Sequence, residues 1–253
     1  MEGATTCRRS FTSCGLDPGP FWGQVYDNLA SFRHGGRFLT LLNVQSKPVH
    51  LCGHALGKKR HICAFVSSRE EEYRIMGPYV REGYERGERL LQIIDARGRE
   101  DHLARLQRAG VNTEQAIARG QMSVFGWEDT YLQGGSFDVD RMANTIEGVL
   151  QSRAAEGYPL ARGIGNMEWI LASKTSTESV LEYETRVSEF APRYDDVLVC
   201  TYDINKFPAN FLFDVLRTHP AAIIGGMLQE NPFYVPPEQM LKELQARKRN
   251  GGL

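Results

Sequence analysis

The sequence predicts an α/β fold in which helices cover both faces of a mostly parallel central sheet. Apolar runs alternate with helical segments at least five times, which is typical of parallel strands joined by right-handed helical crossovers. One of these runs, Leu160–Trp169, contains two glycines and ends abruptly in Glu168 and Trp169, as expected for a buried central strand. Two further runs also close on a carboxylate, at Asp95 and Asp203. Such strand ends predict a ligand crevice along one edge of the sheet.

The composition is that of an ordinary globular protein. Of the 253 residues, 42% are hydrophobic and 24% are charged, which suits one large domain or a domain with an appendage. The net charge of -1, from 30 basic and 31 acidic residues, gives no field that attracts nucleic acid or anionic lipid. No window approaches the roughly 18–20 apolar residues that cross a bilayer. We therefore expect a cytoplasmic protein without direct contact to nucleic acid or membrane.

Two regions of the chain differ in character. Residues 1–45 mix Gly, Pro, Ser and Arg with short apolar stretches and keep neither a helical nor a strand period. We expect an irregular or partly disordered N-terminal extension there and assign it no function. The regular pattern begins at about Val49, so residues 46–253 are taken as the domain.

The strands are predicted from apolar runs bounded by turn residues. A short edge strand or hairpin is expected at 49–57, and the first buried strand follows at 61–66, before the Ser67-Ser68 turn. The other strands are expected at 89–95, 121–127, 160–169, 196–203 and 221–228.

The helices are predicted between these strands, mainly from their capping residues. Ser68 is a suitable N-cap for a helix over 69–85, and Gly77-Pro78 should kink or segment that helix. Asp138 caps a helix that runs to about residue 155. The remaining helices are expected at 99–109, 113–120, 176–190, 210–216 and 237–249.

Motifs for nucleotide binding are missing from the expected positions. A phosphate loop needs GxxxxGK and Ser or Thr after a strand, whereas the equivalent turn here, SSREEEYRIMGP, has no lysine and three consecutive glutamates. Gly163-x-Gly165 lacks the third glycine of a dinucleotide fingerprint and lies within a strand, so we interpret both glycines as sites of close packing. There is no GxSxG elbow to suggest a hydrolase. We expect no ATP hydrolysis and no cofactor.

A metal site is also considered and set aside. Two histidines and two cysteines in or beside strands offer transition-metal ligands: His61, Cys63, Cys200 and His219. Strand polarity argues against their joining the strand-end acids, because both histidines precede or open their strands while Glu168 and Asp203 close theirs. We expect a structural role for the four residues, with ligand contact as the alternative, and no metal. The cysteines, five in all and without framework spacing, should be reduced thiols.

The strongest candidate for a ligand-binding site is the set of polar and aromatic side chains at the carboxyl ends of the strands. Its indoles, phenol, hydroxyls and carboxylates suit a pocket for a small apolar or cationic ligand. The predicted ligand-binding residues there are Ser67, Ser68, Trp127, Glu168, Trp169, Tyr202 and Asp203. Glu184, in the helix after the central strand, either faces this pocket or faces solvent. The alternative for the whole set is that the acids cap helices and the aromatic side chains complete the core.

Several blocks in this order resemble the MEDS family, the methanogen/methylotroph DcmR sensory domain. They are HICAFVSSREEEYRIMGPYVREGYERGERLLQIID, YLQGGSFDVDRM, GNMEW, VLEYETRVSEF, CTYDINKF and DVLRTHPAAIIGGMLQENPFYVPPEQML, which together cover roughly Val49 to Arg249. The resemblance implies a RecA/KaiC-like core without its phosphate loop, serving as a sensory module for hydrocarbon derivatives or related small molecules. The residues of this chain at positions that match the family's motifs are His61, Glu168, Trp169, Glu184, Tyr202, Asp203 and His219.

The leading functional hypothesis is therefore a non-enzymatic cytoplasmic sensor that binds a small organic ligand. Members of the family are often fused to a DNA-binding, kinase or anti-sigma module, and we recognise none here, so we expect output through a separate protein partner. Assembly with further copies of the chain stays open. The alternatives are an enzyme acting on a small organic or one-carbon compound, with Glu168 or Asp203 as general base, and a degenerate nucleotide-binding regulator.

Overall fold

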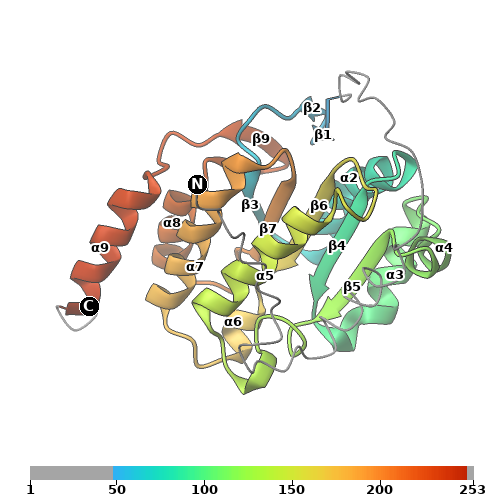
Figure 1. Ribbon diagram of the computed structural model, residues 1–253. Helices are drawn as coiled ribbons and strands as arrows, with labels where there is room; N and C mark the ends of the chain where they lie inside the picture. Colours follow the sequence, from blue (N-terminus) through green and yellow to red (C-terminus); the bar gives the residue numbers. More distant parts are fainter. Residues whose placement is uncertain (1–47, 250–253) are drawn as a thin grey trace, which may run out of the picture. The chain divides into compact units, whose positions relative to one another are not determined.

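The computed structural model describes residues 48–249. In these residues a seven-stranded sheet lies between two layers of helices (Figure 1), and a separate two-stranded hairpin is also present. The hairpin pairs β1 (His50–Leu51) with β2 (His54–Ala55) and matches the expected edge element. The predicted extension at 1–45 lies outside the described residues. Within 48–249, no helix is long and apolar enough to span a membrane.

The large sheet has the strand order β5-β4-β6-β7-β3-β8-β9. The strands from β3 to β8 are all parallel, and β9 alone runs antiparallel, along β8. Their bounds are β3 (His61–Val66), β4 (Arg89–Ile94), β5 (Met122–Gly126), β6 (Ala161–Asn166), β7 (Val197–Asp203), β8 (Ala221–Ile224) and β9 (Met227–Glu230). This mostly parallel sheet confirms the predicted fold class.

Helices cover both faces of the sheet, and each face has its own core. Helices α2, α3 and α4 lie on one face, and α5, α7, α8 and α9 lie on the other (Figure 1). Buried side chains of each group of helices pack into the core on their own face. The helix bounds are α2 (Arg69–Glu85), α3 (Arg99–Arg108), α4 (Thr113–Ala118), α5 (Val139–Ser152), α6 (Trp169–Ala172), α7 (Thr177–Phe190), α8 (Ala209–Thr218) and α9 (Pro237–Arg249). Three short 3-10 turns are η2 (Ala96–Gly98), η3 (Gln133–Gly135) and η4 (Ala191–Arg193).

The local signals placed the helix starts correctly. Ser68, Asp138 and Ser176 are N-caps whose side chains accept from a backbone N–H in the first turn, as their residue types predict. Helix α2 nevertheless continues through Pro78, so the expected segmentation is wrong. The helix buries Ile75, Met76, Tyr79 and Val80 on both sides of the proline, and we attribute its continuity to this packing.

Two predicted strands end earlier than expected. The run 221–228 forms β8 and β9 instead of one strand, because Gly225 and Gly226 take φ values of 59° and 76° and make a tight hairpin turn between them. Strand β6 stops at Asn166, whose side-chain oxygen accepts a hydrogen bond from the backbone N–H of Glu168 at 3.2 Å. Asx turns of this kind redirect a chain. Glu168 and Trp169 therefore lie beyond the strand, and Trp169 begins α6.

The glycines of β6 are required by close packing, as the sequence indicated. A Cβ atom on Gly163 would lie 2.8 Å from Leu198 Cδ2, and one on Gly165 would collide with the hydroxyl of Tyr131. Both glycines therefore set how closely the central strand approaches its neighbours.

A buried arginine anchors the start of β6. Arg162 is 0% exposed and donates to the Glu88 carboxylate, to Glu82 Oε2 at 2.9 Å and to the Tyr79 carbonyl at 2.7 Å. Its guanidinium also lies 4.5 Å from the centroid of the Tyr79 ring. These contacts satisfy a charge that would otherwise be costly inside the protein.

We expect Arg162→Met to lower the free energy of unfolding by about 3 kcal/mol or more, because Glu88 would keep a buried charge without its main partner. Denaturant unfolding measures this change. The control is Lys242→Met, which breaks the exposed pair with Glu238 and should alter stability little. Equal losses in the two variants would contradict the role assigned to Arg162.

Candidate functional site

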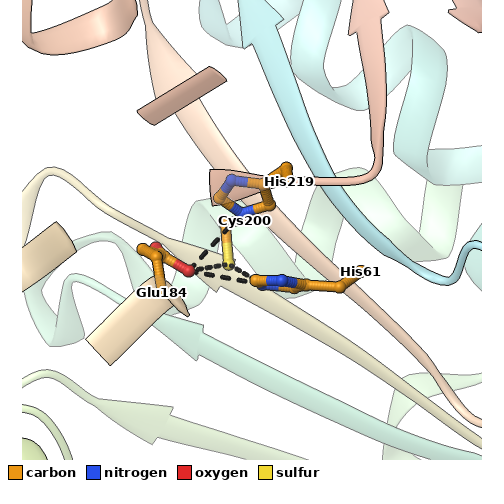
Figure 2. Close-up of side chains that lie close together, drawn as sticks. All are labelled: His61, Glu184, Cys200 and His219. Carbon is orange, nitrogen blue, oxygen red and sulfur yellow. Dashed lines mark hydrogen bonds and ion pairs between the residues drawn. The ribbon is translucent and has the colours of Figure 1, made fainter. Parts of the chain in front are cut away.

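Four side chains with metal-type or acid-base chemistry meet inside the core of the α7 face. They are His61 at the start of β3, Cys200 in β7, Glu184 in α7 and His219 between α8 and β8 (Figure 2). Their exposed fractions are 1%, 6%, 0% and 0%, respectively. We call these four residues the buried cluster.

Strand order brings the cluster together. β3 lies between β7 and β8, and His61 is paired in register with Leu198, two residues before Cys200 on the same side of β7. His219 lies two residues before Ala221, the first residue of β8. Helix α7 covers this part of the sheet and carries Glu184.

Glu184 is the closest common neighbour in the buried cluster. Its Oε2 atom lies 3.3 Å from His61 Nε2, 3.4 Å from His219 Nε2 and 3.5 Å from Cys200 Sγ. Cys200 Sγ is 3.7 Å from His61 Nε2, and all four ligand atoms lie within 4.8 Å of one another.

The outer hydrogen bonds assign the imidazole tautomers. Ser188 Oγ donates to the Thr218 carbonyl at 2.6 Å, so it accepts from His61 Nδ1 at 2.7 Å. His219 Nδ1 lies 3.0 Å from the Val215 carbonyl, which can only accept. Both Nδ1 atoms therefore carry hydrogen, and in the neutral rings both Nε2 lone pairs face the cluster. His219 Nε2 is buried and has no hydrogen-bond partner among the described residues.

Burial and mutual charge set the protonation of the buried cluster. Burial, followed by the neighbouring His219, lowers the pKa of His61 to about 4, which makes its ring neutral at pH 7. Burial raises the pKa of the Cys200 thiol well above its usual range. Burial would also raise the pKa of Glu184, but His219 and His61 outweigh it and hold the pKa below its ordinary value. Tyr202 adds a donor, with its hydroxyl 2.5 Å from Glu184 Oε1.

The structure corrects the sequence argument about these residues. The argument from strand direction considered only residues at the ends of strands. Glu184 lies in helix α7, and its carboxylate reaches both histidines. Glu184 therefore faces neither a carboxyl-edge pocket nor solvent. The fourth member is Cys200, whereas Cys63 has its Sγ 3.8 Å from the Ala221 carbonyl. Both cysteines are buried and unpaired, as predicted.

The aromatic members of the predicted crevice lie in the core. Trp127, Trp169 and Tyr202 are 4%, 0% and 0% exposed. The indole of Trp169 stacks on Tyr131 with ring centroids 4.8 Å apart and lies 4.6 Å from the Phe137 ring centroid. The expectation that Trp169 stands at an open strand end is therefore wrong, because the turn after β6 returns it to the core. A ligand contact by these three side chains stays a prediction.

The polar members remain at the carboxyl ends, where they are bonded to neighbouring side chains. The Glu71 carboxylate accepts from Ser67 N and Ser67 Oγ at 2.8 and 2.6 Å, and Ser68 caps the same helix. This acid occupies the helix N-terminal turn, where a phosphate loop would hold an anion. Glu168 Oε2 and Asp203 Oδ2 lie 2.7 and 3.7 Å from Lys206 Nζ.

A small cavity lies beside the buried cluster, between the sheet and helices α5 and α7. Its volume is about 40 Å³. The cavity is lined by Leu91, Ile93, Tyr131, Ile146, Val149, Leu150, Gly163, Ile164, Gly165, Tyr183, Val187, Leu198, Val199 and Cys200. The two glycines of β6 leave part of this space, and Cys200 belongs to both the cavity wall and the buried cluster. The one local feature that points to the cavity is the Gly163-x-Gly165 run within an apolar strand.

Comparisons with known proteins agree on a sensory family. Residues 60–220 match the family model described as MEDS, the methanogen/methylotroph DcmR sensory domain. The chain is 24% identical over 160 residues to the transcriptional repressor DcmR of Methylorubrum extorquens, a match that covers 63% of this chain and 57% of the repressor. The chain thus spans less than two thirds of that relative's length.

Among solved structures, the chain is similar to the flagellar accessory protein FlaH from Methanocaldococcus jannaschii. The similarity has a TM-score of 0.41 and 9% identity, and it covers 70% of this chain and 78% of FlaH.

The burial of Trp169 leads to a stability prediction. Trp169→Ala should lower the free energy of unfolding by about 3–5 kcal/mol, because it removes a fully buried indole. Leu171→Ala, in the same short helix but at a side chain that is 50% exposed, should change stability much less. Denaturant melts of both variants measure the difference. A Trp169→Ala protein of near wild-type stability would contradict this placement of the indole.

Proposed function

The chain belongs to the MEDS family of sensory domains, and from this premise we propose that it binds a small, mostly apolar organic ligand and passes that signal to a regulatory output. The sensory role is common to the family. The ligand class, its site and the partner are our proposal. The main observation that supports them is the cavity between β6, α5 and α7.

The size and lining of this cavity favour a compound of only a few heavy atoms. An engineered apolar cavity of about 150 Å³ binds benzene, whereas this one measures about 40 Å³. Its walls are mostly aliphatic, and its polar groups are those of Tyr131, Tyr183 and Cys200. An apolar pocket with a few polar groups is the usual arrangement for orienting a small ligand. Hydrocarbon derivatives of one to three carbons fit this description.

Helix α7 supplies a physical route from the cavity to the surface. It lines the cavity through Tyr183 and Val187 and also packs against α8 and α9. Lys248 of α9 lies 2.6 Å from Glu182 of α7, so a shift of α7 changes a contact of the C-terminal helix. We propose that a protein partner in the cytoplasm recognises this change and that the described domain contacts no nucleic acid itself. Assembly with further copies is compatible with this route.

Contacts at the carboxyl ends of the strands disfavour both alternative functions, nucleotide binding and catalysis. Glu71 fills the anion position of the α2 N-terminus, which disfavours a bound nucleotide phosphate. The ion pairs of Lys206 engage both candidate general bases, Glu168 and Asp203. The predicted ligand contacts of Ser67, Ser68 and Trp127 therefore stand as secondary to the cavity.

We predict that a panel of one- to three-carbon alcohols, thiols, halides and alkanes contains a compound that stabilises the full chain. A ligand at about 100 times its dissociation constant should add about 2.7 kcal/mol to the free energy of unfolding. Thermal melts monitor this stabilisation, and gas chromatography of the same samples monitors consumption. Catalytic consumption would favour the enzyme hypothesis, and no stabilisation by any member would contradict the proposed ligand class.

Two matched valine variants locate the binding site. Val149→Ile adds a methylene at the cavity wall and should abolish stabilisation by the identified compound. Val124→Ile makes the same change in the core on the opposite face, where the side chain is equally buried at 8% exposure. The second variant should respond to the compound as the wild type does. An unchanged response of Val149→Ile would exclude this cavity as the site.

A further inference from the structure

We propose that His61, Glu184, Cys200 and His219 bind one divalent transition-metal ion, with Zn²⁺ preferred, in a closed four-coordinate site. This inference concerns the buried cluster (Figure 2). It does not depend on ligand binding in the neighbouring cavity.

The spacing of the ligand atoms agrees with tetrahedral coordination. Zinc bonds of about 2.0–2.2 Å to nitrogen or oxygen and about 2.3 Å to sulfur place tetrahedral ligand atoms roughly 3.3–3.6 Å apart. The Glu184 oxygen lies 3.3, 3.4 and 3.5 Å from the ligand atoms of His61, His219 and Cys200. All four atoms lie within 4.8 Å of one another, so small side-chain rotations bring the remaining pairs to coordination distance.

The same distances are too long for protonated ion pairs. A charge-assisted N–H···O bond between imidazolium and carboxylate would normally be about 2.7–2.9 Å. Here both Nε2 atoms are 3.3–3.4 Å from Glu184 Oε2, and within residues 48–249 His219 Nε2 has no hydrogen-bond partner. Four electron-pair donors therefore converge on a point that a cation can occupy.

Outer contacts hold three of the ligands in this orientation. Ser188 accepts from His61 Nδ1 at 2.7 Å, and the Val215 carbonyl accepts from His219 Nδ1 at 3.0 Å. Tyr202 donates to the second oxygen of Glu184 at 2.5 Å. Hydrogen bonds from metal-bound histidines and carboxylates to outer partners are the usual means of fixing ligand direction.

Charge balance explains how the ion can be buried. When the metal–sulfur bond forms, the Cys200 thiol releases its proton to solvent. A divalent ion with a Glu184 carboxylate, the resulting Cys200 thiolate and two neutral imidazoles has no net charge, and burial of a neutral site avoids most of the cost of burying an ion. The donor set of two nitrogens, one sulfur and one oxygen suits zinc, whereas magnesium and calcium prefer oxygen. With four protein ligands, the site has no open position for water. We therefore infer an ion that joins β3, β7, α7 and the start of β8.

The test begins with the full chain, unfolded and refolded with excess Zn²⁺ or Co²⁺ because the site is closed to solvent, then freed of loosely bound metal. We expect one equivalent of metal by elemental analysis. The cobalt protein should show the intense visible bands of tetrahedral coordination and a thiolate-to-cobalt charge-transfer band. Refolding without metal should give a protein of lower melting temperature. Much less than one equivalent, or octahedral cobalt bands, would overturn the proposal.

Two pairs of variants identify the ligands. Cys200→Ser should lose the charge-transfer band, whereas Cys63→Ser, which changes the other buried strand cysteine, should keep it. His219→Asn should lose the stoichiometric metal, whereas His102→Asn, at a buried histidine in the opposite core, should retain it. Retention of the wild-type cobalt spectrum by Cys200→Ser would overturn the assignment. If either ligand variant fails to fold, the metal stoichiometry and the charge-transfer band of the wild-type protein still test the proposed metal site.

Discussion

The carboxylate of Glu184 is the constraint on which the α7 side of this protein depends. An isolated carboxylate at 0% exposure would carry a large desolvation cost. The Tyr202 hydroxyl offsets part of this cost by donating to Oε1 at 2.5 Å, and the His61 and His219 rings, whose orientation is fixed by Ser188 and Val215, lie beside the other oxygen. These neighbours come from β7, from β3 and from the segment between α8 and β8, so the placement of α7 over β7, β3 and β8 is specified by polar contacts as well as by apolar packing.

At the carboxyl ends of the strands, the polar side chains are engaged in contacts with one another. The turn after β3 and the N-terminus of α2 have the geometry that suits an anion, but the Glu71 carboxylate takes that position and accepts from Ser67. Lys206 engages Glu168, which follows β6, and Asp203, the last residue of β7. Open α/β sheets usually bind ligands at this edge, and here its polar side chains are bonded to one another.

The cavity and the buried cluster are physically adjacent. Gly165 and Cys200 are direct register partners on β6 and β7, and α7 contributes Tyr183 to the cavity and Glu184 to the cluster. A Cβ atom at position 165 would collide with the hydroxyl of Tyr131, which also lines the cavity. The cavity and the buried cluster therefore share one strand pair and one turn of α7. Close-packed interiors transmit displacements because they contain little free space.

The local features of this protein follow directly from short stretches of its sequence. Buried strands follow from continuous apolar runs, and the starts of α2, α5 and α7 follow from Ser68, Asp138 and Ser176, because capping and periodicity depend only on neighbouring residues. The alternation of these elements was sufficient for the fold class. The glycine pair at 225–226 was also visible, but its positive φ values, which split one predicted strand into a hairpin, were not anticipated.

The candidate site, by contrast, depends on how distant segments pack together. Residues 61, 184, 200 and 219 meet because β3 lies between β7 and β8 and because α7 turns Glu184 toward them, and neither fact is encoded in local periodicity. The same holds for Trp169, whose burial depends on a turn at Asn166 and on Tyr131 from a distant segment. Strand order and helix rotation are set by the packing of the whole core, so they join side chains that no short stretch of sequence relates.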